Sequence, residues 1–197
     1  MAAKDREMQK RVLAYFKNAV DVACKVEANQ VVVTSGWGFL NEQREEVYKR
    51  SVQMLRKVSD YAFEKNMTLA IEALQPDESM LVHTAEEMKQ LIDDVDSPAL
   101  KVCIDTGAMV RAKDTIDDYF KIFGDRIVHA HFVDVDEDHF TTHLAWGDGT
   151  RNMKEELEAF RRNGYKGILS VECVNGRYFE NPKVADKQSM KNFLKFK

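Results

Sequence analysis

Four side chains that can bind a metal ion stand at or near the ends of short apolar segments: Glu72, Asp105, His131 and Glu172. Parallel strands bring their carboxyl ends to one face of a sheet or barrel, so these four groups could converge. Three carboxylates and one imidazole suit Mn²⁺, Mg²⁺, Co²⁺ or Fe²⁺ better than a structural zinc site, which prefers thiolate and imidazole. A divalent cation would also supply the partner that a carboxylate near an apolar strand needs, because uncompensated burial of charge is costly.

Each of these residues also has an ordinary interpretation. Glu72 could pair with a lysine, and Asp105 could cap a following turn. His131 could be a core histidine, and Glu172 could face solvent. The equivalent position of all four relative to predicted strands favours a shared site over four separate roles.

The segment 127–136 begins as an apolar, β-branched run, which predicts a buried strand. His129 and His131 are two positions apart and therefore point to the same face of that strand. They could bind a metal or be a pair of hydrogen-bonded core histidines. Because His129 lies one strand repeat deeper, we expect it to orient its neighbours rather than to bind the metal. Cys103 and Cys173 are weaker thiol candidates near the same strand ends.

The rest of the sequence alternates between helical and strand patterns. Helices are predicted at 5–28, 42–65, 84–95, 115–123, 152–163 and 183–196, and strands at 30–35, 67–74, 100–105, 127–136 and 167–173. Thr84 and Glu87 have the spacing of a capping box, and Gly124 is a predicted C-cap. Thr106-Gly107 predicts a turn, and 136–151 a long loop. This alternation is typical of parallel βα units in an α/β fold.

Composition limits the classes of partner. The chain has 197 residues, 44% of them hydrophobic, which is enough for one domain with a core. The formal net charge of −4 makes nucleic acid and anionic membranes poor partners. The charged N-terminal residues do not resemble a signal peptide, and no apolar run approaches the roughly 20 residues of a membrane span. Three widely spaced cysteines indicate reduced core residues, so we expect a cytoplasmic protein.

Two architectures fit five βα units: an open doubly wound sheet, or part of a (β/α)8 TIM barrel. No Gly-x-Gly-x-x-Gly motif opens a helix, and no phosphate-binding loop of the Gly-x4-Gly-Lys-Ser/Thr type is present. A dinucleotide-binding fold therefore lacks its main support. A barrel normally needs eight strands and about 250 residues.

Several motifs carry a resemblance to a known family. The segments 71–79, 103–107, 129–134, 143–149 and 170–173 resemble those of the xylose isomerase-like sugar epimerases. The likeness is greatest to ketose 3-epimerases of the fructoselysine 3-epimerase type, and it extends from about residue 10 to 195. It implies a partial (β/α)8 TIM barrel, xylose isomerase-like, with about five parallel strands. Residues 1–197 would then form a single, incomplete barrel domain that contains the last five βα units.

The resemblance also implies a mechanism. One divalent metal ion, Mn²⁺ with Mg²⁺, Co²⁺, Fe²⁺ or Zn²⁺ as alternatives, would be held by Glu72, Asp105, His131 and Glu172. Glu72 and Glu172 would serve as the catalytic acid–base pair on a small sugar or sugar derivative. The implied substrate-binding residues are Glu78, His143 and Trp37. The chemistry agrees, because epimerisation beside a ketone needs two carboxylates to exchange a proton and a cation to stabilise the enediolate.

Three departures from the family pattern affect the substrate and the barrel. Many free-ketohexose epimerases have a histidine where this chain has Ala108 and an arginine where it has Glu137. These departures argue against free psicose or tagatose and leave a ketosamine open. The resemblance begins inside the third βα unit, so we expect three strands of the family barrel to be missing. The open edges should then make the chain a homo-oligomer or lead it to bind a fragment that supplies those strands.

Other functions remain open on the same residues. A hydroxypyruvate isomerase or an inosose dehydratase would use the same ligand positions. A non-catalytic remnant that binds a metal, a sugar or another chain is a different class. An apurinic endonuclease is disfavoured, because it needs a richer set of histidines and aspartates for three zinc ions.

Overall fold

The computed structural model describes residues 1–196, which divide into two compact units, Met1–Cys103 and a second unit that begins at Ile104. The division falls within one strand, β3 (Leu100–Asp105). Each unit is described separately below. No helix among the described residues is both long enough and apolar enough to cross a membrane.

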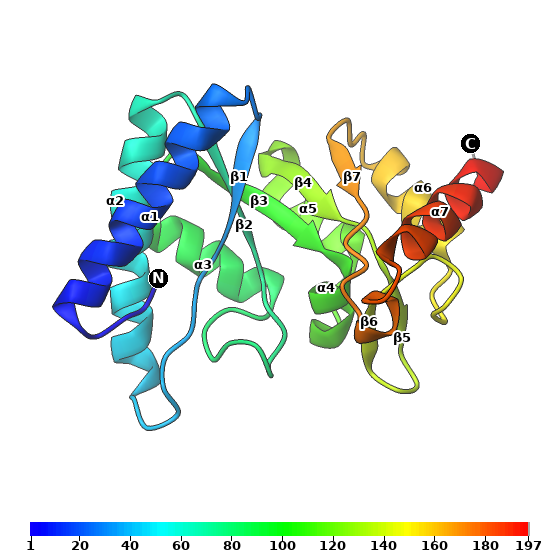
Figure 1. Cartoon of the computed structure of the whole chain (residues 1–197), viewed down its shortest axis with the longest axis horizontal. Helices are drawn as coiled ribbons and strands as arrows, with labels where there is room; N and C mark the ends of the chain where they lie inside the picture. Colours follow the sequence, from blue (N-terminus) through cyan, green and yellow to red (C-terminus); the bar gives the residue numbers. More distant parts are fainter. Residues whose placement is uncertain (197) are drawn as a thin grey trace. The chain divides into compact units, whose positions relative to one another are not determined.

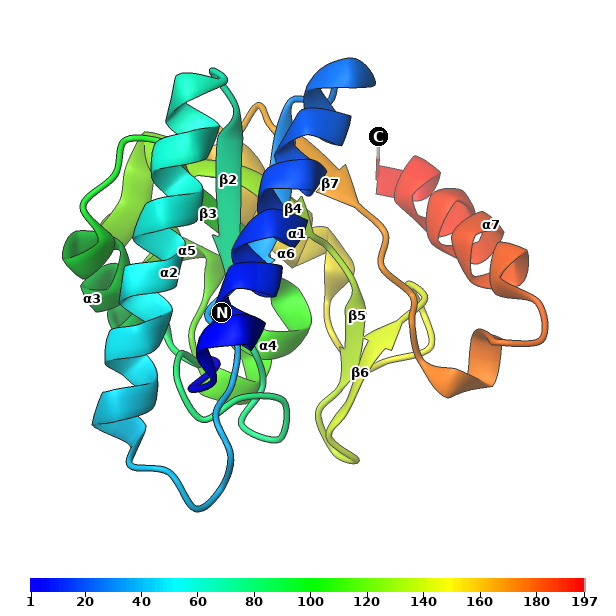
Figure 2. The ribbon, with the colours of Figure 1, turned by 60° about the vertical axis from the view of Figure 1, so that its left-hand side comes forward.

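The first unit is a parallel ladder with helices against it. Its elements are α1 (Arg6–Lys25), β1 (Gln30–Thr34), α2 (Arg44–Glu64), β2 (Thr68–Glu72), α3 (Ala85–Val95) and the first part of β3. β1 pairs with β2 in register from Gln30↔Thr68 onward, and β2 pairs with β3 from Leu69↔Leu100. Figures 1 and 2 both show α1 alongside α2 (Figure 1, Figure 2).

Apolar side chains at helical spacing explain why α2 lies against the ladder. Val47, Leu55 and Val58 are fully buried, and so is Leu69 on β2. α3 begins at the predicted capping box, in which the Thr84 hydroxyl accepts a bond from the Glu87 N–H at 3.1 Å. It ends at Val95, as the sequence predicts.

The second unit contains more elements than the sequence predicts. They are α4 (Thr106–Ala112), α5 (Ile116–Phe123), η1 (Gly124–Arg126), β4 (Ile127–His131), β5 (Asp134–Asp136), β6 (Thr141–Leu144), α6 (Met153–Arg162), β7 (Ile168–Ser170), η2 (Gly176–Tyr178), α7 (Pro182–Phe193) and η3 (Leu194–Phe196). β4 and β7 pair in parallel, with His129 opposite Ile168 and His131 opposite Ser170. β5 and β6 form an antiparallel hairpin, visible in Figure 2. Phe132 packs edge-on against Trp146 and Phe160, with ring centroids 4.6 and 5.3 Å away.

The predicted α/β class is confirmed, with five parallel strands in the chain. Three local predictions are wrong. Thr106-Gly107 is not a turn but the start of α4, because the Asp105 carboxylate caps this helix. The predicted loop 136–151 contains β6.

The third correction concerns strand length. The predicted strand 127–136 stops at His131, because the Thr106 hydroxyl then satisfies both the N–H and the carbonyl of Val133, each at 2.9 Å. The predicted strand 167–173 is reduced to β7, whose partner strand β4 ends opposite Ser170. Glu172 therefore lies two residues beyond a strand rather than at its end.

Candidate metal centre

Asp105 is the last residue of β3 and the N-cap of α4, so one side chain serves two elements. Its Oδ1 atom accepts a hydrogen bond from the Ala108 N–H at 2.7 Å. Its Oδ2 atom faces two imidazoles, those of His131 at 3.6 Å and His143 at 3.5 Å. Burial raises the pKa of the Asp105 carboxyl, but the two imidazoles and the Ala108 N–H outweigh it and hold that pKa well below its usual range. The carboxylate form is therefore the stable one.

His131 is the last residue of β4 and is almost fully buried. Its Nδ1 atom lies 3.0 Å from Glu172 Oε2 as well as 3.6 Å from Asp105 Oδ2. Asp105, His131 and Glu172 each offer a ligand atom, and these atoms lie within 4.8 Å of one another. Three of the four predicted metal ligands are thus brought together inside the second unit.

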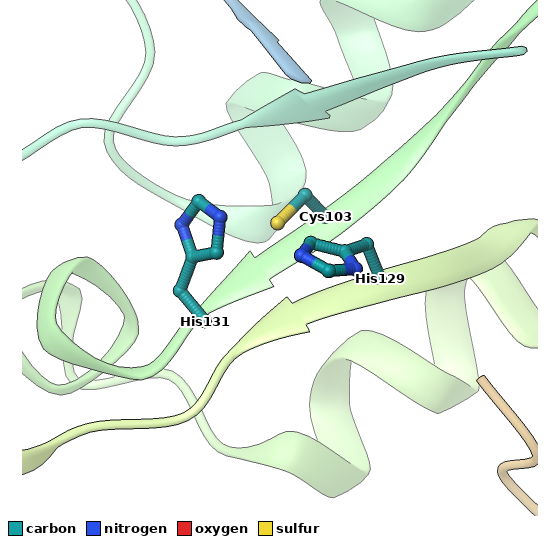
Figure 3. Close-up of side chains that lie close together, drawn as sticks. All are labelled: Cys103, His129 and His131. Atoms are coloured by element: carbon teal, nitrogen blue, oxygen red, sulfur yellow. The ribbon is translucent and has the colours of Figure 1, made fainter. Parts of the chain in front are cut away.

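His129 lies on the same face of β4 as His131, as the two-residue spacing predicts. The two rings meet edge to face, with centroids 5.2 Å apart and an interplanar angle of 87°. Figure 3 draws both imidazoles on their strand, together with the thiol of Cys103 (Figure 3). The Nε2 atom of His129 lies 2.7 Å from the Ser170 hydroxyl of β7, and burial lowers the pKa of the imidazole. This contact ties His129 to the β4–β7 ladder, which fits an orienting role.

Glu172 differs from the other two ligands in its support. It follows β7 by two residues, and 37% of its side chain is exposed, against 5% for Asp105. Its Oε2 atom nevertheless reaches both imidazoles, at 3.0 Å from His131 Nδ1 and 3.7 Å from His143 Nε2. The position of the Asp105 carboxylate is thus fixed by β3 and by the helix that it caps, whereas Glu172 lies two residues beyond β7.

His143 enters this group from β6, the strand that sequence patterns did not predict. Its backbone is left-handed, with φ of 57°, a conformation that is unusual for a non-glycine residue. Its Nδ1 atom lies 3.0 Å from the Thr142 hydroxyl, and its Nε2 atom faces Asp105 and Glu172. Only the family resemblance had singled out this residue.

Gly107 is a site residue that the sequence analysis missed. A Cβ atom there would lie 3.0 Å from Asp105 Oδ1, 3.3 Å from Thr142 Cβ and 3.5 Å from His143 Cε1. The missing side chain therefore lets the β5–β6 hairpin lie against the start of α4. The sequence signal for this close approach is a glycine two positions after a candidate ligand, because glycine has no side chain to block it.

Asp134 fixes the loop that follows the hairpin. Its side chain is fully buried and accepts four backbone N–H bonds: from Val135 and Gly147 at 2.8 Å, Gly149 at 3.2 Å and Arg151 at 3.3 Å. A Cβ atom on Gly149 would lie 2.5 Å from both Asp134 Oδ1 and the Val135 carbonyl oxygen. The Gly-Asp-Gly segment is thus held close to the strand that leads to His143.

The other predicted site residues belong to the first unit. Glu72 is the last residue of β2, so its strand-end position is confirmed. Glu78 lies in the loop after β2, where its carboxylate accepts a bond from the Gln75 N–H at 2.9 Å. Trp37 follows β1 and is 66% exposed.

The donor set of the second unit fits a divalent cation. It combines carboxylate and imidazole groups, which are the ligand types that transition metals and zinc accept. Ala108 and Glu137 are the two positions that differ from many free-ketohexose epimerases. Ala108 is buried and donates its N–H to Asp105, and Glu137 pairs with Arg151 at 3.1 Å.

Residues 1–195 match the family described as the xylose isomerase-like TIM barrel. The chain belongs to this family. The family is enzymatic, and the chain is a member of its sugar isomerases and epimerases.

Characterised relatives of this TIM-barrel chain include epimerases. It is 27% identical to the fructoselysine 3-epimerase of Shigella flexneri over 193 residues, which cover 98% of this chain and 69% of the relative. It is 30% identical to the inosose dehydratase of Lacticaseibacillus casei over 118 residues, which cover 51% of this chain and 39% of the relative. The predicted family and enzyme class are therefore confirmed.

Solved structures support the barrel fold. The IOLI protein, described with a binding zinc atom, matches with a TM-score of 0.79 at 18% identity. The match covers 99% of this chain and 72% of the IOLI chain. A D-psicose 3-epimerase crystallised in the presence of D-fructose has a TM-score of 0.76 at 19% identity, with the same coverage. At these identities the likeness concerns the fold alone.

Proposed function

We propose that this chain is a divalent-metal-dependent sugar epimerase that inverts C3 of a ketose or ketosamine. The observation that carries the proposal is the convergence of two buried donors, Asp105 and His131, with the partly exposed Glu172. Such a convergence needs a positive partner, because buried carboxylates are costly without one. The fructoselysine 3-epimerase relative supports this choice of reaction.

The proposed ligands have different tasks. Asp105 and His131 are the buried ligands that fix the position of the ion. Glu72, at the end of β2 as Asp105 is at the end of β3, is the proposed fourth ligand, on the basis of that strand position. The cation would stabilise the negative charge that develops on the substrate oxygens when the C3 proton leaves. Three carboxylates and one imidazole favour Mn²⁺.

Proton transfer is assigned to Glu72 and Glu172. Inversion requires that one carboxylate removes the C3 proton from one face of the substrate and the other returns a proton to the opposite face. The partial exposure of Glu172 suits it to contact a substrate that enters from solvent. Glu78, Trp37 and His143 are the proposed substrate contacts.

We also propose that the chain works as a homo-oligomer, which sedimentation at low micromolar concentration tests.

Exchange of the C3 hydrogen with solvent deuterium tests the reaction. Incubation of the metal-loaded protein with fructoselysine in deuterium oxide should incorporate one deuterium at C3. Glu72→Gln and Glu172→Gln should each abolish this exchange. His139→Gln is the matched control, since this exposed hairpin residue pairs with Asp136 and does not face the donors. Exchange that persists in the double Gln variant would exclude the two-carboxylate mechanism.

Dehydration of an inosose is the second candidate, because a Lacticaseibacillus casei inosose dehydratase is 30% identical over about half of this chain. It would use the same donors to remove a proton beside a ketone and then expel a hydroxyl group. Release of a dehydrated product from an inosose, without C3 exchange in a ketosamine, would favour this reaction.

A further inference from the structure

Glu172 is the proposed acid–base carboxylate that lies beyond the sheet ladder. It belongs to the segment 171–175, called here the Glu172 segment, which connects β7 to η2. Its Oε2 atom nevertheless pairs with His131 Nδ1 at 3.0 Å and with His143 Nε2 at 3.7 Å. A group outside the ladder therefore has to fix this carboxylate, because a misplacement of about 1 Å can slow a reaction about 100-fold.

Asn175 connects the Glu172 segment to the hairpin strand β6. Its Nδ2 atom donates a hydrogen bond to the Thr142 carbonyl at 3.3 Å, and its Oδ1 atom accepts one from the Arg177 N–H at 3.2 Å. The first bond reaches the residue next to His143, and the second caps η2. A side chain that makes both bonds must donate on one side and accept on the other, which is what an amide does.

The end of η2 is fixed independently of Asn175. The Tyr178 ring is buried, and its hydroxyl accepts the Ala145 N–H at 3.0 Å and donates to Asp148 Oδ2 at 2.5 Å. The Gln188 side chain of α7 donates to the other oxygen of Asp148 at 2.7 Å. The Glu172 segment thus has β7 at one end and an anchored helix at the other, so the contact of Asn175 with β6 sets its path between them.

The backbone of the segment transmits this position to Glu172. The Val174 N–H donates to the Glu172 carbonyl at 2.9 Å, so the chain turns tightly between Glu172 and Asn175. Cys173 packs against a buried cluster that consists of Leu144, Ala145, Tyr178 and Ala185. A displacement of Asn175 would therefore move the Glu172 backbone with it.

We propose that Asn175 is a positioning residue for the reaction: its bond to the Thr142 carbonyl holds the Glu172 carboxylate opposite the two imidazoles. This inference rests on the proposed function, in which Glu172 transfers a proton. All of these residues belong to the second unit. β6 is itself paired with β5, whereas the Glu172 segment lies beyond β7, so loss of the bond should displace Glu172 rather than His143.

Asn175→Ser tests this role. Serine can cap η2 as asparagine does, but its shorter side chain does not reach the Thr142 carbonyl. At saturating Mn²⁺, kcat for C3 exchange of fructoselysine should fall by about 10–100-fold. KM should stay unchanged, since the proposed substrate contacts are intact. Asn175→Asp keeps the size and the cap but has no donor, and it should show the same loss of kcat.

Asn181→Ser is the matched control. Asn181 is exposed at the start of α7, and its side chain makes no capping bond. The same substitution there should leave kcat and KM unchanged. Urea unfolding followed by the fluorescence of Trp146 should show that both serine variants are fully folded under the assay conditions, so that a loss of kcat is not a loss of fold.

Mn²⁺ affinity gives a second readout that does not depend on turnover. Asn175→Ser should weaken Mn²⁺ binding by about tenfold, as the loss of a group that orients a ligand does. It should weaken it no further in a protein that already contains Glu172→Ala, because the bond acts only through that carboxylate. A general disturbance of the unit would weaken binding equally in both backgrounds.

Four outcomes overturn the inference. The first is a kcat and Mn²⁺ affinity like those of Asn181→Ser. The second is a raised KM with an unchanged kcat, which would mean that the bond places His143 instead. The third is an effect on Mn²⁺ binding that persists beside Glu172→Ala. The fourth is a wild type that binds no Mn²⁺, which overturns the proposed function as well. A wild type that binds Mn²⁺ but exchanges no C3 hydrogen overturns the proposed reaction alone, and the Mn²⁺ measurements then decide whether Asn175 positions Glu172.

Discussion

Replacing Asp134 by asparagine should destabilise the second unit by several kcal/mol, although the two side chains have nearly the same shape. The Oδ1 atom of Asp134 accepts the N–H groups of Val135 and Arg151, and Oδ2 accepts those of Gly147 and Gly149. Asparagine offers only one oxygen, and its amide nitrogen would face two N–H groups that donate toward it. Two buried donors are then left without acceptors.

The magnitude follows from these two donors. A buried donor without a partner costs about 1–3 kcal/mol, which gives about 2–6 kcal/mol for the pair. Part of this cost is recovered, because burial raises the pKa of Asp134 despite its four backbone bonds, and a neutral amide avoids the cost of burying a charge. We therefore expect a loss of about 2–4 kcal/mol.

Urea unfolding followed by tryptophan fluorescence measures this loss. Trp146 is buried in the second unit and donates its indole N–H to the Phe132 carbonyl, so its emission reports that unit. Asp136→Asn is the matched control on the same strand, because this carboxylate accepts its bonds near solvent. If Asp134→Asn lowers the free energy of unfolding by no more than the control does, the two N–H groups have not lost their acceptors.

Three further changes have defined outcomes. Gly107→Ala places a Cβ atom 3.0 Å from Asp105 Oδ1 and should weaken Mn²⁺ binding by about tenfold, whereas Gly176→Ala, where a Cβ atom meets open space, should not change it; equal affinities would refute the close approach. Burial and a neighbouring carboxylate raise the pKa of Tyr178 to about 12, so the stability that its neutral phenol contributes is complete below pH 10 and is lost as pH rises toward 12. The ultraviolet difference titration between wild type and Tyr178→Phe should then have its midpoint near 12, and a midpoint near 10 would contradict this. Thr84→Ala removes the N-cap of α3 and should cost about 1 kcal/mol in thermal unfolding; an unchanged melting temperature would show that the cap contributes little.

Sequence patterns located the strands well, although three of them were predicted too long, because apolar strands are short and bounded by polar residues. Glu72, Asp105 and His131 are each the last residue of their strands. The alternation of strands with amphipathic helices was sufficient for the α/β class. These features depend on local spacing, which a single sequence contains.

The predictions failed where a distant group decides the local structure. The strand at His131 ends early because Thr106, 27 positions before Val133, satisfies the Val133 backbone. β6 is four residues long and mostly polar, so its pattern does not differ from a loop. His143 therefore had no predicted element to position it, and its place beside Asp105 could not be derived from spacing.

Asp105 connects the start of α4 to the candidate metal centre through the two oxygens of one carboxylate. Glutamate at this position is one methylene longer, so it could not both cap the helix from the N-cap residue and keep an oxygen beside the two imidazoles. Asparagine could still cap the helix, but it would present a neutral atom to the ion. Among related chains, an asparagine at this position would therefore mark a protein that has kept the fold and given up the metal, a change that similarity of overall sequence would not reveal.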